Sequence, residues 1–128
     1  MKEIIKKYQD KFSELRFWSV LSKFAKKIGL KSVYSALLLF YAYRRSETPA
    51  WAKRVVIGTL GYLLAPFDMI PDLSPLIGLT DDVGILSFGV VTIASFINDE
   101  VKQNARQHLS KWFGEYDENE LEDIDAKL

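Results

Sequence analysis

The sequence predicts an all-α fold, a compact bundle of four main helices with an ordered Pro/Asp-rich loop between the third and the fourth. Apolar residues recur at spacings of three and four along most of the 128-residue chain, which is the period of an amphipathic helix. Glycines and prolines stand at the ends of these periodic segments, where helices begin and end. The length and the 48% hydrophobic content suffice for one core, so we expect a single domain at 1–114, followed by a mobile acidic tail at 115–128.

The first two helices are predicted in the basic half of the chain. Over residues 3–28, apolar residues follow one stripe and lysines occupy mostly the other faces, and Gly29 is suited to end this helix. A second helix is expected from Lys31 to Arg45, where two arginines close an apolar run and favour a helix C-terminus.

The third helix is expected from Pro49 to about Leu64, with Thr48 as its cap and Pro49 at its first position. The fourth is predicted as one long helix from Asp81 to Phe113, with Asn98-Asp99 as the point where it could divide.

Two glycines within the fourth helix, Gly84 and Gly89, lower its helix propensity and therefore predict close approach of a neighbouring helix. We expect the first three helices to pack their apolar faces around Val83–Ile97. The core is predicted to include Trp18, Leu21, Ile57, Leu60, Leu86 and Val90.

The segment from Tyr62 to Asp82 combines prolines and aspartates with apolar residues. Proline removes a backbone donor and restricts the residue before it, so we expect no helix to run through this segment. Its apolar content favours an ordered loop. The residues that shape the loop are Pro66, Pro71, Pro75 and Gly78, and its acidic residues are Asp68, Asp72, Asp81 and Asp82.

Two stretches of this loop, Pro66-Phe67-Asp68-Met69-Ile70-Pro71-Asp72 and Gly78-Leu79-Thr80-Asp81-Asp82, resemble the double signature of the YkvA-like family (domain of unknown function 1232). Both halves and their spacing match, and the resemblance covers roughly residues 55–97. It implies a helical hairpin and, for many relatives, association with a membrane. It implies no established reaction.

The four aspartates have two interpretations. They can cap turns and helix starts, as aspartate often does. Alternatively, clustered carboxylates and loop carbonyls form a site for a hard divalent cation such as Mg²⁺, Ca²⁺ or Mn²⁺. No histidine or cysteine lies near the loop to support catalysis, and the single histidine, His108, is expected to be a partly buried helix residue.

Charge is distributed unevenly between the halves of the chain. Residues 1–54 carry a net charge of +9 and residues 55–128 a net charge of −9, so that the whole chain is neutral. This asymmetry favours either an anionic partner for the basic half or pairing of the two halves with each other. The residues expected to contact an anionic membrane surface or an acidic protein are Lys6, Lys7, Lys23, Lys26 and Lys27. A neutral total charge and the lack of a binding motif argue against nucleic acid.

The longest apolar runs are too short for a membrane span, at 11 residues for 33–43 and 55–65 and 15 for 83–97, against about 20 needed. The leading hypothesis is therefore a non-enzymatic adaptor domain that is cytoplasmic and peripheral at a membrane, with the Pro/Asp loop as its interaction site. The alternatives are a divalent-metal-binding module or small metal-dependent enzyme, and an integral multi-pass membrane protein. A homo-oligomer is compatible with each.

Overall fold

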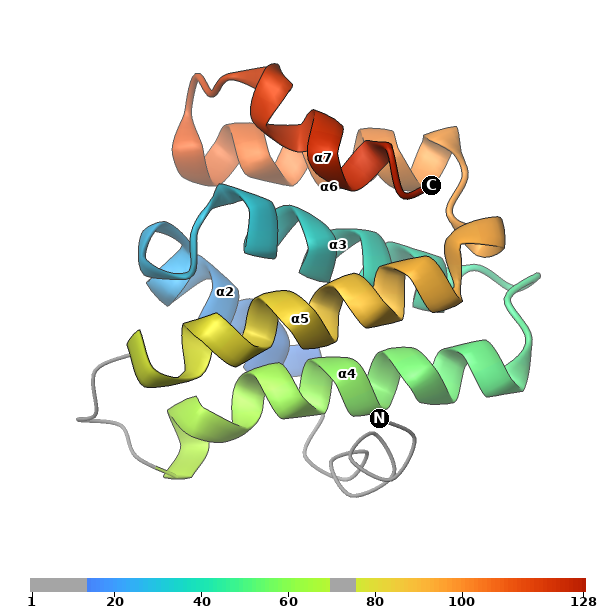
Figure 1. Ribbon diagram of the computed structural model, residues 1–128, viewed down its shortest axis with the longest axis horizontal. Helices are drawn as coiled ribbons and strands as arrows, with labels where there is room; N and C mark the ends of the chain where they lie inside the picture. Colours follow the sequence, from blue (N-terminus) through green and yellow to red (C-terminus); the bar gives the residue numbers. More distant parts are fainter. Residues whose placement is uncertain (1–13, 70–75) are drawn as a thin grey trace.

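A computed structural model describes the chain over residues 14–69 and 76–128, with side chains over 14–64 and 84–128. Within these ranges the regular structure is entirely helical, which confirms the all-α prediction. The longer helices are α2 (Glu14–Ile28), α3 (Leu30–Arg44), α4 (Ala50–Met69), α5 (Leu76–Thr92) and α6 (Asp99–Phe113). Short 3₁₀ turns at Ala94–Phe96 and Glu118–Leu121 and a final turn, α7 (Glu122–Asp125), complete the fold (Figure 1).

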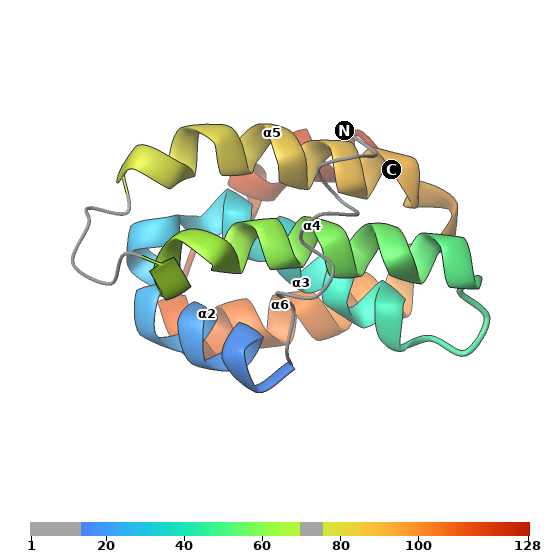
Figure 2. The same cartoon turned by 90° about the horizontal axis from the view of Figure 1, so that it is seen from below.

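The centre of the bundle is α3, which contacts α2, α4, α5 and α6. Every residue from Ser32 to Phe40 is buried, because this segment has apolar or small residues on all sides of the helix. The expectation that the other helices surround Val83–Ile97 is therefore wrong. That segment belongs mainly to α5, which lies beside α4 at the surface of the bundle (Figures 1 and 2).

The turn between α2 and α3 follows the sequence prediction closely. Gly29 has a φ of 99°, which lies in a region that favours glycine, and its N–H donates to the carbonyl of Ala25 over 2.9 Å. Gly29 thus ends α2 and immediately precedes α3. Residues 1–13 of the predicted first helix lie outside the described residues.

The predicted long fourth helix is wrong, because the chain divides between α5 and α6. Its apolar period continues across the break, but Asn98 accepts a hydrogen bond from the N–H of Val101 (2.9 Å) and so caps a new helix. Just before it, the carbonyl of Phe96 accepts from the Arg45 guanidinium over 2.6 Å. Gly114, with a φ of 68°, ends α6 as predicted.

The Pro/Asp segment is more helical than we predicted. Helix α4 continues past Pro66 to Met69, and α5 already begins at Leu76, before Gly78. Proline at position 66 removes a single backbone donor four residues from the end of α4, which does not prevent the helix from continuing. The connection between the two helices shrinks to residues 70–75, which contain Pro71, Asp72 and Pro75 and lie outside the described residues.

The two glycines of α5 differ in their surroundings. A Cβ atom at Gly89 would lie 3.1 Å from Oγ1 and 3.2 Å from Cγ2 of Thr59 in α4, so the expected close approach is confirmed there. A Cβ atom at Gly84 would meet nothing within 4 Å, so the same expectation is wrong for Gly84.

The start of α4 also differs from the prediction. The helix begins at Ala50, one residue after Pro49, whose carbonyl accepts from the N–H of Lys53 over 3.1 Å. The buried Thr48 hydroxyl donates backwards to the carbonyl of Ala42 (2.6 Å). The last carbonyls of any α-helix have no partner within the helix. Thr48 therefore supplies a hydrogen-bond donor to a carbonyl at the end of α3 and does not cap α4.

The C-terminal segment, predicted as a mobile tail, instead folds back onto α3 and α6. Leu121 and Ile124 are buried in the common core. The Tyr34 hydroxyl donates to Asp125 over 2.7 Å, and the Arg106 guanidinium donates to the other oxygen of that carboxylate over 2.5 Å. Two apolar residues among seven acids are enough to anchor the segment, because each acid that faces α3 or α6 finds a donor.

The predicted core is confirmed at four positions and only partly at two. Leu21, Leu60, Leu86 and Val90 are buried. Trp18 and Ile57 are half-buried, and Trp18 packs at the edge of the core against Phe17 and Phe40.

Candidate functional site

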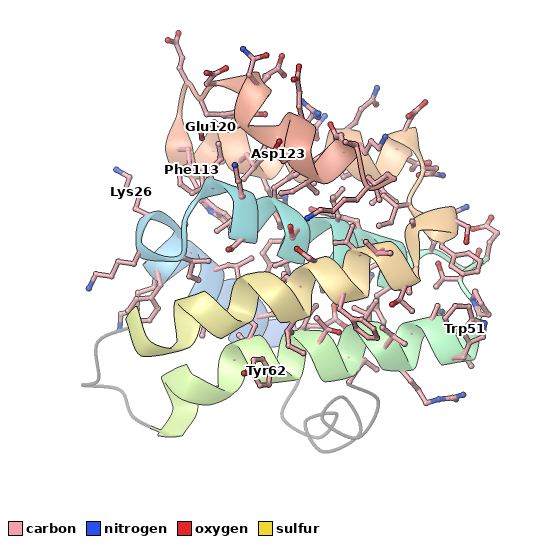
Figure 3. All side chains as sticks on the ribbon, viewed as in Figure 1. Lys26, Trp51, Tyr62, Phe113, Glu120 and Asp123 are labelled. Carbon is pink, nitrogen blue, oxygen red and sulfur yellow. The ribbon has the colours of Figure 1, made fainter. Side chains whose placement is uncertain are left out.

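The exposed side of α2 is strongly basic. Its buried side is formed by Phe17, Val20, Leu21, Ala25 and Ile28, so helical periodicity turns Arg16, Lys23, Lys26 and Lys27 outward together. Within Glu14–Ile28 the only acid is Glu14, which faces α3 and pairs with Arg44 over 2.7 Å. We call the four cations the basic face of α2. Figure 3 shows Lys26 projecting from one end of the molecule.

An aromatic ring lies between two of these cations. Phe24 is half-buried, and the ammonium groups of Lys23 and Lys27 lie 5.5 Å and 5.9 Å from the centre of its ring. Such cation–π contacts hold the lysine stems against the helix while their charged ends stay in water. The predicted contact residues Lys23, Lys26 and Lys27 therefore form one surface, whereas Lys6 and Lys7 lie outside the described residues.

The aspartates of the predicted site are divided between elements. Asp68 belongs to the last turn of α4, and Asp81 and Asp82 lie in the second turn of α5. Because α4 and α5 are consecutive antiparallel helices, these positions fall at the same end of the hairpin, and the α2–α3 turn lies at that end too (Figures 1 and 2). Asp72 and the side chains of the other three lie outside the described part of the chain.

The position of Asp81 and Asp82 bears on the capping interpretation. Since α5 begins at Leu76, neither residue is at the start of that helix, and the expectation that Thr80, Asp81 or Asp82 caps it is wrong. Among the side chains that the structure describes, no group of three His, Asp or Glu residues is arranged to hold a metal ion. The divalent-cation interpretation thus stays a prediction about the four loop aspartates.

A polar cleft of about 370 Å³ opens where the C-terminus of α3 meets the N-terminus of α6. Its walls include Tyr41, Arg44, Arg45, Asn98 and Asn104, with Glu47 and Glu100 at its sides. Both guanidinium groups already have partners, since Arg44 pairs with Glu14, and Arg45 lies 3.7 Å from Glu47 and also binds the Phe96 carbonyl. The positive charges in the cleft are therefore neutralised by acids of the same protein, and the contact of Arg45 with Phe96 gives the cleft a structural role beside the start of α6.

His108 is a partly buried helix residue, as predicted. Its Nδ1 lies 2.7 Å from the Tyr41 hydroxyl, and its ring centre lies 4.6 Å from that of Trp18. Burial lowers the pKa of His108, and the nearby Lys111 lowers it further. These contacts give the imidazole a structural role between α2, α3 and α6.

With the geometry established, comparison with known families gives one result. Residues 52–88 match the model of DUF1232, a protein family of unknown function. This segment belongs to the DUF1232 family. The family assignment made from the Pro/Asp signature is confirmed, since both halves of that signature lie within the matched range. No curated protein and no solved structure shows a significant match to the chain.

In structural terms, the DUF1232 match covers almost all of α4 and most of α5. The family region is thus the hairpin beside the central helix, and the basic face of α2 lies outside the match. Within the part of the chain that the structure describes, no helix has both the length and the hydropathy required to cross a bilayer.

Sequence reasoning missed two features. One is the outer side of α5, where Phe88 and Val91 are exposed although their segment was expected at the centre. The other is the group of contacts that holds the C-terminal segment, Tyr34, Arg106 and Asp125. Leu121 and Ile124, three residues apart, were the one sequence signal that this acidic segment packs against something.

Proposed function

We propose that this protein is a non-enzymatic helical module that attaches peripherally to an anionic membrane surface and presents its Pro/Asp connection to a partner. The observation that carries the proposal is the basic face of α2, where four cations share one exposed side of the segment Glu14–Ile28, whose single acid pairs with Arg44 of α3. Each Lys or Arg near an anionic bilayer contributes about 1 kcal/mol of attraction, which decays within a Debye length.

The pairing of charges within the protein supports this assignment. The acidic C-terminal segment is held against α3 and α6, where Asp123 binds Lys31 over 2.9 Å and Asp125 binds Arg106. These acids neutralise cations away from α2. Among the side chains described over 14–64 and 84–128, pairing between the two halves of the chain, the alternative explanation of the charge asymmetry, accounts for Lys31 through Asp123, whereas Lys23, Lys26 and Lys27 form no ion pair with the acidic half.

Flotation with vesicles tests the proposal. We expect binding to vesicles containing phosphatidylserine or phosphatidylglycerol, weak binding to phosphatidylcholine alone, and release by high salt. The double substitution Lys26→Glu and Lys27→Glu should weaken binding on the order of 1000-fold, because two attractions of about 1 kcal/mol become two repulsions of similar size, a change of about 4 kcal/mol in all.

The matched control is Lys102→Glu with Lys111→Glu, which changes the net charge equally but on α6. It should bind nearly as well as the unmodified protein. Equal binding to neutral and anionic vesicles, or equal loss in the two double variants, would refute a contact made by the basic face of α2.

A further inference from the structure

Two helical segments of the bundle, residues 32–40 of α3 and residues 84–92 of α5, contain no charged residue, but only the first is buried throughout. All residues of α3 from Ser32 to Phe40 are buried. On α5, Phe88 is 37% exposed and Val91 is 54% exposed. A helix that is apolar all round is usually enclosed by protein or lipid. The outer side of α5 therefore lacks a cover that its composition indicates.

The residues of this region carry no charge of their own. From Val83 to Asn98, sixteen consecutive residues include no Asp, Glu, Lys or Arg. Among the described residues 84–98 the exposed positions are Gly84, Phe88, Val91, Ser95 and Asn98, and the first three share one phase of α5, which ends at Thr92. The water-facing side of a helix in a globular protein ordinarily carries charged residues, so an uncharged stripe of this length marks a contact surface.

The surface extends to α4, where it gains an aromatic residue and a cation. Trp51 is 45% exposed and its ring packs edge-on against Phe96, with ring centres 5.7 Å apart. Arg54 is exposed three residues further along α4, on the neighbouring part of the same helix side. Figure 3 shows Trp51 at the end of the molecule opposite Lys26. Tryptophan next to cations is typical of segments that lie at the boundary between headgroups and acyl chains.

The polar groups on this side are already satisfied by the protein. The Thr92 hydroxyl donates to the carbonyl of Phe88 over 2.6 Å, one turn earlier in α5. The Ser87 hydroxyl accepts from the Lys127 ammonium over 3.3 Å. Because burying a polar group costs little when its hydrogen bond is retained, this surface can leave water with a small desolvation penalty.

We propose that Phe88, Val91 and Trp51 form an insertion face that enters the headgroup and acyl boundary of an anionic membrane. This inference rests on the proposed function and adds a second, hydrophobic contact to the electrostatic one. Lipid is the occupant to which we commit, since the exposed Arg54 complements anionic headgroups and no acid interrupts residues 83–98. Helix α4 contacts both α2 and α5 and lies between them, and α5 and α2 stand at opposite edges of the view in Figure 2.

The chain has no cysteine, which permits a site-specific probe. We would introduce Val91→Cys, label it with an environment-sensitive fluorophore, and place the same label at Gln103→Cys on exposed α6 as a control. With vesicles containing phosphatidylserine, the label at position 91 should shift to the blue and be quenched by lipids carrying a spin label in the upper acyl chain. The label at position 103 should do neither.

The second measurement is flotation of the double variant Phe88→Ser with Val91→Ser, whose exposed positions should leave folding intact, as melting checks. Its partitioning to anionic vesicles should fall by about tenfold or more. Suppose that the unmodified protein binds these vesicles, but the label at position 91 stays in water and the double variant binds normally. The insertion face is then refuted and attachment through α2 stands. A protein partner would then be the occupant to seek for the exposed side of α5. If the unmodified protein binds no anionic vesicle, the proposed function fails and this inference fails with it.

Discussion

The two glycines of α5 provide a direct test of how tightly the DUF1232 hairpin packs. Replacing either glycine by alanine removes backbone freedom from the unfolded chain and raises helix propensity by about 1 kcal/mol. At Gly84 nothing opposes this gain, because the added methyl group meets no atom within 4 Å. We expect Gly84→Ala to raise the free energy of unfolding by about that amount, which corresponds to a rise in Tm of about 3–6 °C.

At Gly89 the same methyl group would lie 3.1 Å from Oγ1 and 3.2 Å from Cγ2 of Thr59. Thr59 is fully buried, and its hydroxyl donates to the Val55 carbonyl over 2.7 Å. Rotating the threonine away would break that hydrogen bond, so either the side chain or the helix must shift. Overpacking of this kind costs about 1–3 kcal/mol. After subtracting the propensity gain, we expect Gly89→Ala to lower the free energy of unfolding by about 0–2 kcal/mol.

Urea denaturation of the two variants, followed by circular dichroism, measures the contrast. A double-mutant cycle with Thr59→Ala then identifies its cause, since that substitution removes both opposing atoms. In the Thr59→Ala background, the effect of Gly89→Ala should move by about 1–3 kcal/mol towards that of Gly84→Ala. If Gly89→Ala stabilises the unmodified protein as much as Gly84→Ala does, α4 and α5 are not in the close contact described above.

Two further predictions concern other parts of the fold. Leu121→Ala should lower the free energy of unfolding by about 2–5 kcal/mol, because Leu121 is fully buried although it lies in the acidic C-terminal segment; a change within about 0.5 kcal/mol in urea denaturation would mean that this segment does not contribute to the core. His108 has a lowered pKa in the folded state, so the unfolded chain takes up its proton first as the pH falls. The stability linked to His108 should therefore be complete above the ordinary pKa of 6.5 and decrease as the pH falls from there through the folded-state pKa. His108→Gln should remove this part of the pH dependence, and identical slopes in the two proteins below pH 6.5 would contradict it.

Local sequence signals predicted most helix boundaries correctly. Gly29 and Gly114 both have positive φ in the structure, which is the conformation that glycine was expected to supply at a helix end. The break before α6 was harder to predict, because Val90, Ile97 and Val101 keep one apolar phase across it. Only Asn98 marked the new start, and an Asn in a periodic segment is also compatible with an exposed helix position.

The Pro/Asp segment shows how a strong local rule can overestimate a loop. Three prolines in ten residues predicted a long connection, yet α4 includes Pro66 and α5 begins one residue after Pro75. Proline is incompatible with a helix only through the donor it lacks and the preceding turn it crowds. Near the end of one helix and just before the start of the next, those effects are small. The metal interpretation of the aspartates depends on side chains outside the described residues and stays a prediction.

The central position of α3, rather than α5, could not be predicted from periodicity, because both helices are apolar all round and the pattern does not say which one is covered. The C-terminal segment decides between them. Leu121 and Ile124 cover part of α3, and Asp125 gives the fully buried Tyr34 hydroxyl an acceptor, without which burial of that side chain would be unfavourable. Burial and this hydrogen bond both raise the pKa of Tyr34, so the hydroxyl keeps its proton and stays a donor. With α3 enclosed on this side by its own chain, α5 remains beside α4, and Phe88 and Val91 stay exposed. The acidic tail that seemed least structured in the sequence is thus one reason why α3, and not α5, is the enclosed helix.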